Sequence, residues 1–318
     1  MAVVPANKTS IENAAALLRA GELVAFPTET VYGLGADATN GEAVARIFAA
    51  KGRPRFNPLI VHVASIAEAQ NLAEFSPLAL LLAEKFWPGP LTIVLKRRPN
   101  CNLSELVTAG LETVAVRMPA HPIATALIAT TGRPLAAPSA NRSGHVSPTR
   151  ASHVADDLRD KVTMILDAGE TQHGLESTVV TFDRDQILLL RPGSITADEL
   201  SDATGAAVER TLKASTTPIS PGQLASHYAP TARVRLDVTH PVPGDALLAF
   251  GPHVPDHTGP MLNLSETGDL IEAAARLFWA LRTLDLSGAA TIAVMPIPHD
   301  GIGEAINDRL NRAAAPRP

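Results

Sequence analysis

The sequence predicts an α/β fold in two parts: a twisted mixed sheet with flanking helices, then a long linker and a smaller Rossmann-like α/β domain. Two observations carry this prediction. Short apolar runs that can form buried strands alternate with segments whose apolar residues recur at helical spacing. A stretch rich in Ser, Thr, Pro and Gly over 211–230 lacks any such spacing. We therefore expect domains at 1–205 and 231–318, joined by a linker at 206–230.

Caps and apolar runs define the elements of the first domain. Ser76 followed by Pro77 is typical of a helix start, and Thr196 with Glu199 has the spacing of a capping box. Helices are expected to begin near residues 10, 42, 65, 77, 122 and 196. Strands are expected over 22–26, 59–63, 91–95, 113–117, 135–137, 162–166, 178–182 and 187–190, with 28–35 as a loop. Little helix separates the last three strands, so part of the sheet should be antiparallel.

The second domain repeats the alternation on a smaller scale. Strands are expected over 234–236, 246–250 and 291–295, and amphipathic helices over 270–284 and 302–312. About 85 residues is within the normal size range of a domain.

Composition excludes several classes of protein. The net charge is −5, from 27 basic and 32 acidic residues, and aromatic residues make up 4%, so neither bulk charge nor base stacking favours nucleic-acid binding. A single cysteine, Cys101, excludes a disulfide framework. No apolar run approaches the ~18 residues of a membrane span, and the N-terminus does not resemble a secretory signal. We expect a cytoplasmic protein without a membrane contact.

A basic cluster follows one predicted helix. Lys51, Arg53 and Arg55 lie within five residues, and Asn57 and His62 come soon after. Positive charge at a helix C-terminus complements the helix dipole, which explains Lys51 but not the arginines in the proline-bounded loop. Guanidinium groups on a rigid loop suit phosphate, because the planar fork meets two oxygens at once. The cluster therefore predicts a phosphate clamp.

Two loops that follow strands are rich in hydroxyl groups and glycine. One, at 137–149, contains Ser139, Asn141 and Ser147; the other, at 27–35, contains Thr30. Loops beyond the carboxyl ends of strands usually form the ligand edge of an α/β sheet, although hydroxyl-rich turns are also common without a ligand. Neither a G-x-x-x-x-G-K-[ST] nor a G-x-G-x-x-G motif occurs, so a nucleotide would bind by another scheme.

Arg117 and Arg191 end predicted strands, either as solvated strand ends or as clamps for a carboxylate or phosphate. Tyr228 lies in the linker, where it could act as a lid or as an anchor between domains. The sequence contains no H-E-x-x-H, no G-x-S-x-G and no nucleophile–base pair. Basic groups and hydroxyls without a nucleophile suit a reaction in which one bound substrate attacks another.

Seven segments resemble the YrdC domain in order and spacing: PTETVYGLG, KGRPRFNPLIVHV, WPGPLTIVL, VAVRMPAHP, APSANRSGHVSPT, ESTVV and LLRPGSI. The linker SPGQLASHYAP and the domain after it resemble the Sua5 arrangement. The chain is thus similar to the L-threonylcarbamoyladenylate synthases of the YrdC/Sua5 family. The resemblance is strong over 8–205 and weaker beyond. It implies a YrdC-like mixed sheet with a concave, positively charged cleft.

The resemblance also implies a reaction. L-threonine, bicarbonate or CO2, and ATP with Mg²⁺ would give threonylcarbamoyl-AMP and pyrophosphate. A separate transferase complex would then complete N6-threonylcarbamoyladenosine (t6A) next to the anticodon of ANN-decoding tRNAs, with at most weak tRNA contact by this chain. No covalent nucleophile is implied, and no side chain is singled out as a metal ligand.

The motif residues divide into two groups by resemblance. The expected L-threonine contacts are Thr30, His62, Arg117, Ala137 and Ser177. The expected ATP contacts are Lys51, Arg53, Asn57, Thr113, Ser139, Asn141, Ser147, Arg191 and Tyr228, with Lys51 and Arg53 also stabilising charge.

The linker departs from the family pattern, which often has methionine where Gln223 stands and a basic residue where Ser226 stands. This puts its docking in question rather than the chemistry. The main alternative is an RNA-binding module that recognises tRNA through a basic cleft without adenylation activity. An enzyme that adenylates carbamoyl phosphate for metallocentre maturation would carry further acylphosphatase and zinc-finger-like segments, which do not occur in this sequence.

Overall fold

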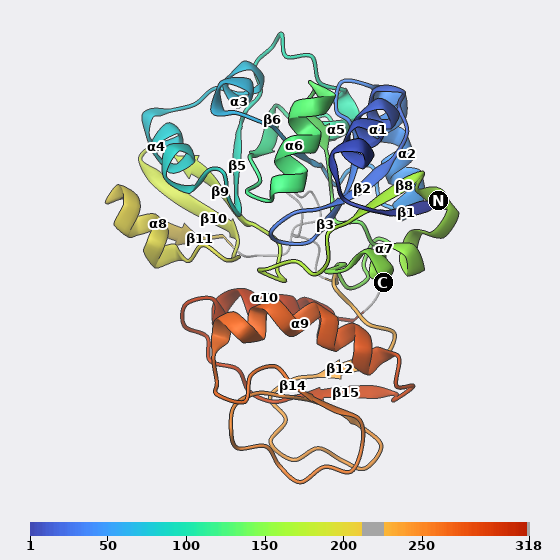
Figure 1. Ribbon diagram of the computed structural model, residues 1–318. Helices are drawn as coiled ribbons and strands as arrows, with labels where there is room; N and C mark the ends of the chain where they lie inside the picture. Colours follow the sequence, from blue (N-terminus) through green and yellow to red (C-terminus); the bar gives the residue numbers. More distant parts are fainter. Residues whose placement is uncertain (212–225, 317–318) are drawn as a thin grey trace.

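The structure, a computed structural model, describes residues 1–211 and 226–316 (Figure 1). Most of the predicted linker, including Gln223, lies outside the described residues. The described part of the chain contains no helix long and apolar enough to cross a membrane.

Eleven described strands of the first domain form one mixed sheet, as the sequence predicts. In spatial order they are β1 (Ala2–Pro5), β8 (Met164–Asp167), β2 (Val24–Pro27), β3 (Tyr32–Asp37), β7 (Leu135–Ala136), β4 (Ile60–His62), β6 (Thr113–Arg117), β5 (Leu91–Lys96), β9 (Thr178–Asp183), β10 (Gln186–Arg191) and β11 (Val208–Arg210). The antiparallel pairing expected among the late strands is found between β9 and β10.

The prediction missed β1 and the helices over 105–108 and 151–158, and it assigned two further segments wrongly. The predicted loop at 28–35 contains most of β3, which pairs antiparallel with β2. The sequence pattern does not indicate this strand, because Gly33 and Gly35 lower its strand propensity. Here glycine is required: a Cβ at Gly35 would lie 2.7 Å from the ring of Phe26. The other segment is 206–210, which we placed in the linker; β11 instead extends the sheet beside β10.

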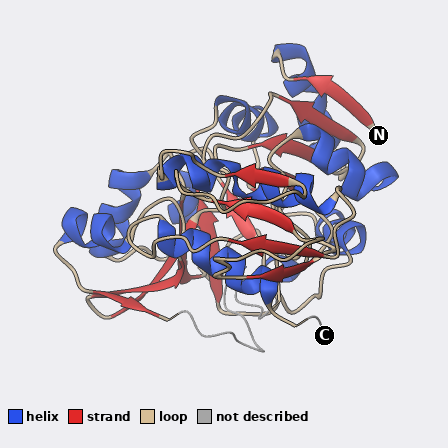
Figure 2. Cartoon of the chain, turned by 90° about the horizontal axis from the view of Figure 1, so that it is seen from below, coloured by secondary structure: helices blue, strands red, loops and turns tan. Residues whose placement is uncertain are grey.

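Helices flank this sheet (Figures 1 and 2). They are α1 (Lys8–Arg19), α2 (Gly41–Lys51), α3 (Ile66–Leu72), α4 (Pro77–Phe86), α5 (Glu105–Thr108), α6 (Pro122–Thr131), α7 (Ala151–Leu158) and α8 (Ala197–Thr204), with a 3-10 turn at Arg159–Lys161. The capping box of Thr196 and Glu199 is confirmed. The helix expected to begin near residue 10 begins at Lys8, with Asn7 as its cap: the side chain of Asn7 accepts the N–H of Ser10 at 3.0 Å, and the hydroxyl of Ser10 accepts the N–H of Asn7.

The second domain has a four-stranded parallel sheet and two long helices. The strands, in spatial order, are β12 (Arg233–Arg235), β15 (Thr291–Val294), β13 (Ala246–Ala249) and β14 (Met261–Asn263). Helices α9 (Leu270–Asp285) and α10 (Gly303–Ala314) lie on the side of the sheet that faces the first domain (Figure 1). The parallel α/β architecture agrees with the prediction, which missed β14.

Apolar and charged contacts hold the two domains together. Val31, Val146 and Leu175 of the first domain are buried in the same cluster as Phe278 of α9. A Cβ added to Gly174 would lie 2.2 Å from a backbone oxygen of α9, so this loop approaches the helix as closely as glycine allows. The second domain therefore packs against the loops at one edge of the large sheet.

Candidate active site

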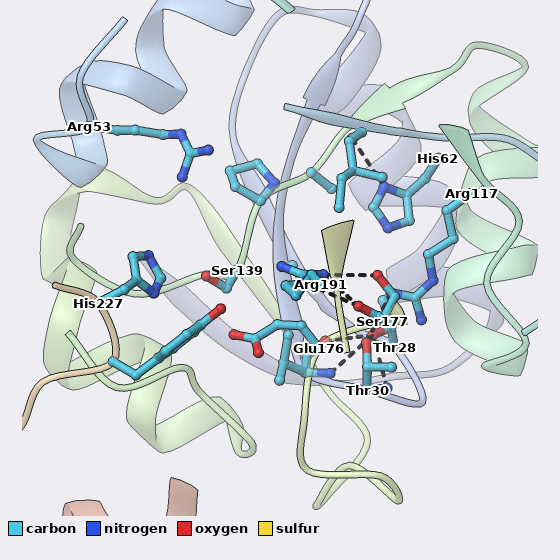
Figure 3. Close-up of a pocket in the computed structure, with 16 residues that line it drawn as sticks. Thr28, Thr30, Arg53, His62, Arg117, Ser139, Glu176, Ser177, Arg191 and His227 are labelled. Carbon is cyan, nitrogen blue, oxygen red and sulfur yellow. Dashed lines mark hydrogen bonds between the residues drawn. The ribbon is translucent and has the colours of Figure 1, made fainter. Parts of the chain in front are cut away.

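A pocket lies at that edge, where several strands of the first sheet begin or end (Figure 3). β4 and β6 run parallel and end at His62 and Arg117. β10 ends at Arg191 beside the start of β9, because these two strands are antiparallel. Nine predicted site residues line the pocket: Thr30, Arg53, His62, Arg117, Ala137, Ser139, Ser177, Arg191 and Tyr228. Its free volume is about 50 Å³.

One end of the pocket contains Arg117, His62 and the turn before β3 (Figure 3). The Arg117 guanidinium donates to Thr30 Oγ1 at 3.0 Å and to the carboxylate of Glu29 at 2.6 Å. Thr28 and Thr30 hydrogen-bond through their hydroxyls at 2.8 Å. Burial would raise the pKa of Glu29, but Arg117 outweighs it and the pKa is lowered. This end offers a fixed guanidinium and small hydroxyl groups, which suit a hydroxy amino acid.

His62 is neutral in this environment. Its ring is buried, and burial together with the positive charge of Arg117 lowers its pKa to about 3. Nδ1 lies 3.3 Å from the carbonyl oxygen of Ile60. Neutral imidazole has one donor and one acceptor nitrogen, so the ring can hydrogen-bond a ligand without adding charge.

The other end of the pocket is cationic. Arg53 lies there with Ser139 and His227 (Figure 3), and Arg191 donates to Ser177 Oγ at 3.0 Å. Within the described residues, neither Arg53 nor Arg191 nor Lys51 has a carboxylate oxygen within 4.0 Å, although all three are buried. Burial lowers the pKa of each of these cations. A buried cation without a counter-ion is costly, so this end is suited to an anionic ligand.

Five predicted site residues do not line the pocket. Lys51 lies behind it and donates to the backbone carbonyls of Ser139 and Asn141. Ser147 donates to Glu176. Asn57 is buried, and its Oδ1 has no hydrogen-bond partner among the described residues. Thr113 is half-buried at the opposite end of β6 from Arg117, about 13 Å along the strand. The fifth is Asn141, which accepts from Ser139 Oγ at 2.5 Å. Their assignment to ATP remains a prediction.

Sequence reasoning missed two acidic residues. Glu29 pairs with Arg117, and Glu176 lines the pocket and pairs with Arg309 of the second domain at 2.9 Å. The partners are 88 and 133 residues apart in the chain. No local pattern signals such pairs.

Two linker residues close the pocket on the side of the second domain. His227 and Tyr228 both line it and are buried. The Tyr228 ring stacks on Phe278 of α9 with centroids 5.5 Å apart, and its backbone has φ +62°, an uncommon value for a residue with a side chain. The two roles weighed for Tyr228, anchor and lid, are therefore compatible in one position.

Comparison with known proteins finds relatives that match both domains of the chain. A family model named Sua5_yciO_yrdC and described as telomere recombination matches residues 16–193, and one described as threonylcarbamoyl-AMP synthase, C-terminal domain, matches 195–315. A threonylcarbamoyl-AMP synthase of Bacillus subtilis is 44% identical over 98% of this chain and 94% of its own length. One of Pyrococcus abyssi is 43% identical over 96% and 94%.

Solved structures extend the similarity to three dimensions. The crystal structure of P. abyssi Sua5 complexed with L-threonine matches with a TM-score of 0.89 at 41% identity, over 98% of this chain and 96% of that one. Escherichia coli YciO, 22% identical with a TM-score of 0.52, shares the fold of the first domain. The chain thus belongs to the Sua5/YciO/YrdC family and carries the C-terminal domain of its threonylcarbamoyl-AMP synthases.

Proposed function

We infer that this chain is a threonylcarbamoyl-AMP synthase, which makes threonylcarbamoyl-AMP and pyrophosphate from L-threonine, bicarbonate or CO2, and ATP for t6A modification of tRNA. Relatives with this name cover nearly the whole chain. One observation of the site carries the inference: a guanidinium set among small hydroxyls lies in the same pocket as Arg53 and Arg191, two buried cations that have no carboxylate oxygen within 4.0 Å among the described residues. These two ends suit an amino acid and a polyphosphate side by side.

The chemistry needs positioning more than a nucleophile. The threonine amine attacks the carbon of CO2 and releases a proton to solvent as it becomes a carbamate; with bicarbonate, the amine proton leaves together with the bicarbonate hydroxyl as water. A carbamate oxygen then attacks the α-phosphorus of ATP while the bond to the bridging oxygen of pyrophosphate breaks. Arg53 and Arg191 line the pocket and would offset the charge on the leaving group. Lys51 lies behind the pocket and would hold its wall through the backbone carbonyls of Ser139 and Asn141. At the other end, Arg117 and Thr30 would orient threonine.

Mg²⁺ would accompany ATP. Among the described residues, no group of three or more His, Cys, Asp or Glu side chains is arranged to hold a metal ion, and both carboxylates near the pocket already pair with arginines. The chain therefore fits a metal that is held mainly by phosphate oxygens and water, which is the usual mode for Mg²⁺ with nucleotides. When bound, the ion would neutralise phosphate charge.

The product defines the next partner. A carbamate joined to phosphate is a mixed anhydride, which water and amines attack. We propose that a tRNA-modifying transferase in the cytoplasm consumes it promptly.

Substrates also require the pocket to open. Ligand pockets usually enclose about 300–1,000 Å³, far more than the free volume of about 50 Å³ found here. His227 and Tyr228 line the pocket from the linker, so their displacement would provide the needed space.

A product assay tests the proposal. Purified protein with ATP, Mg²⁺, threonine and labelled bicarbonate is expected to form an acid-labile labelled adenylate and pyrophosphate, and EDTA should stop both. Reactions that lack threonine provide the control. If no adenylate forms with all substrates present but tRNA binds tightly, the RNA-binding alternative would replace this proposal.

A further inference from the structure

The buried carboxylate of Glu176 poses a problem for a pocket that binds phosphate. Glu176 is 7% exposed and lines the pocket with Arg53 and Arg191, and in Figure 3 it lies between Ser139 and Ser177. A negative charge here would repel a polyphosphate, since like charges brought together are unfavourable. Something must cancel this charge before ATP can bind well.

Arg309 on α10 of the second domain meets that need. Its side chain is fully buried, and Nε donates to Glu176 Oε2 at 2.9 Å. Nη1 donates to Asp308 at 2.8 Å, which fixes the guanidinium on its helix. The same guanidinium lies 5.3 Å from the ring centroid of Tyr228, within the range of cation–π attraction. One side chain thus contacts both a pocket carboxylate and the linker tyrosine.

Polar groups around this contact are still available. Arg309 Nη2 and the Tyr228 hydroxyl are buried and have no hydrogen-bond partner among residues 1–211 and 226–316. Buried polar groups are rarely left unpaired in a folded protein. Their position by the pocket is consistent with a ligand that completes them.

We propose that Arg309 is a positioning residue for the reaction: it neutralises Glu176, so that the pocket of the first domain accepts the phosphates of ATP. The second domain is then part of the nucleotide site and not only an attached module. This inference rests on the proposed function, because it concerns the ATP affinity of that site.

Kinetics of charge-removing variants test the proposal. Arg309→Met keeps much of the side-chain volume but removes the charge. Its KM for ATP is expected to rise about tenfold or more, whereas its KM for threonine should stay within about twofold of wild type. In the double variant Glu176→Gln/Arg309→Met, ATP KM should return to within about threefold of wild type, since both charges are gone. Equal rises in the two KM values, or no recovery in the double variant, would overturn the proposal.

A second ion pair between the domains provides the matched control. Arg282 of α9 pairs with Asp157 at 2.7 Å, and both side chains are largely buried. Asp157→Asn weakens the domain contact without touching Glu176, so both KM values should stay within about twofold of wild type. If it raised ATP KM as much as Arg309→Met, general loosening of the interface would explain the effect instead. If Arg309→Met does not fold, the double variant decides, because it removes both Arg309 and the carboxylate that Arg309 neutralises; a tenfold higher ATP KM there refutes the proposal.

The pH profile separates charge from shape. Arg309 is the charge that most lowers the pKa of Glu176 against the effect of burial, so this pKa should be raised in Arg309→Met. The ATP KM of the variant should then approach that of wild type as the pH is lowered across the range in which the protein stays folded, and a ratio that does not decrease on acidification would contradict the proposal. The titratable groups around Glu176 are Arg309, Arg191, His227, Lys51 and Tyr228. Wild type serves as reference throughout: without product from wild type, it is the proposed function that fails.

Discussion

Acidification should destabilise the fold through two buried histidines. His62 and His227 are 3% and 8% exposed. Burial, reinforced by Arg117 beside His62 and by Arg53 near His227, lowers the pKa of each to about 3. Both imidazoles therefore stay neutral in the native state throughout the range in which unfolded histidine takes up a proton. On acidification the unfolded state binds more protons than the native state does. The free energy of unfolding must therefore decrease as the pH is lowered.

The size of this loss of stability follows from the protonation of histidine in the unfolded state. A pH of 5 is about 1.5 units below the ordinary pKa of histidine in an unfolded chain, and one pH unit corresponds to about 1.36 kcal/mol. Each buried histidine then costs about 2 kcal/mol relative to pH 7.5, or about 4 kcal/mol together. This result requires only that the native pKa lies well below 5. Glu29 and Glu176, whose pKa values are lowered, add stability that is lost only below about pH 4.5.

Urea unfolding at pH 7.5 and 5 measures the effect. Trp87 lies in the first domain and Trp279 in α9, so fluorescence reports on both domains. The loss between the two pH values should be about 2 kcal/mol smaller in His62→Gln than in wild type. His253→Gln, at an exposed position, is the control. If His62→Gln lost as much stability as wild type on acidification, the buried neutral imidazole would be the wrong explanation.

Two further substitutions test the threonine end and the backbone beside it. Arg117→Met removes the guanidinium that is expected to pair with the carboxylate of threonine, and such a charge-assisted pair is worth about 1.5–3 kcal/mol. The KM for threonine should therefore rise far more than the KM for ATP. Equal rises would show that the two ends of the pocket are assigned to the wrong substrates. The same variant leaves Glu29 unpaired, and adding Glu29→Gln should restore part of its melting temperature. Gly193→Ala places a Cβ 2.3 Å from the backbone nitrogen of Thr178, which should cost about 1–3 kcal/mol of stability and lower turnover. An unchanged melting temperature and turnover would contradict that geometry.

Local signals in the sequence predicted most elements of the fold. The helix caps at Ser76 and Thr196 lie where the pattern places them, since each cap bonds a backbone N–H three residues away. Long-range contacts decided the rest. β3 forms despite Gly33 and Gly35, because its neighbours in the sheet supply both its hydrogen bonds and its close packing. No window of the sequence contains that information.

The site shows the same division. Arg117 was found as the end of a predicted strand, and Ser177 through the resemblance of ESTVV to the family motif; both line the pocket. The motifs did not reveal which arginines are already paired. Glu29 lies next to a predicted contact in the chain, and Arg309 lies in a helix that seemed unrelated to the site. Tertiary packing alone brings these groups together.

The two kinds of buried cation account for how one pocket can serve two substrates. Arg117 pairs with Glu29 and Arg309 with Glu176, so these guanidinium groups are held in fixed positions and carry little net charge into the pocket. Arg53 and Arg191 lack a carboxylate within 4.0 Å among the described residues, so their charge is left for a ligand. Folding bears the desolvation cost of these two cations in the absence of nucleotide. A polyphosphate that arrives as their counter-ion recovers that cost as binding free energy, whereas threonine meets a guanidinium that is already neutralised and must share it with Glu29. For the proposed substrates, the arrangement therefore predicts tight binding of ATP and looser, geometry-dependent binding of threonine.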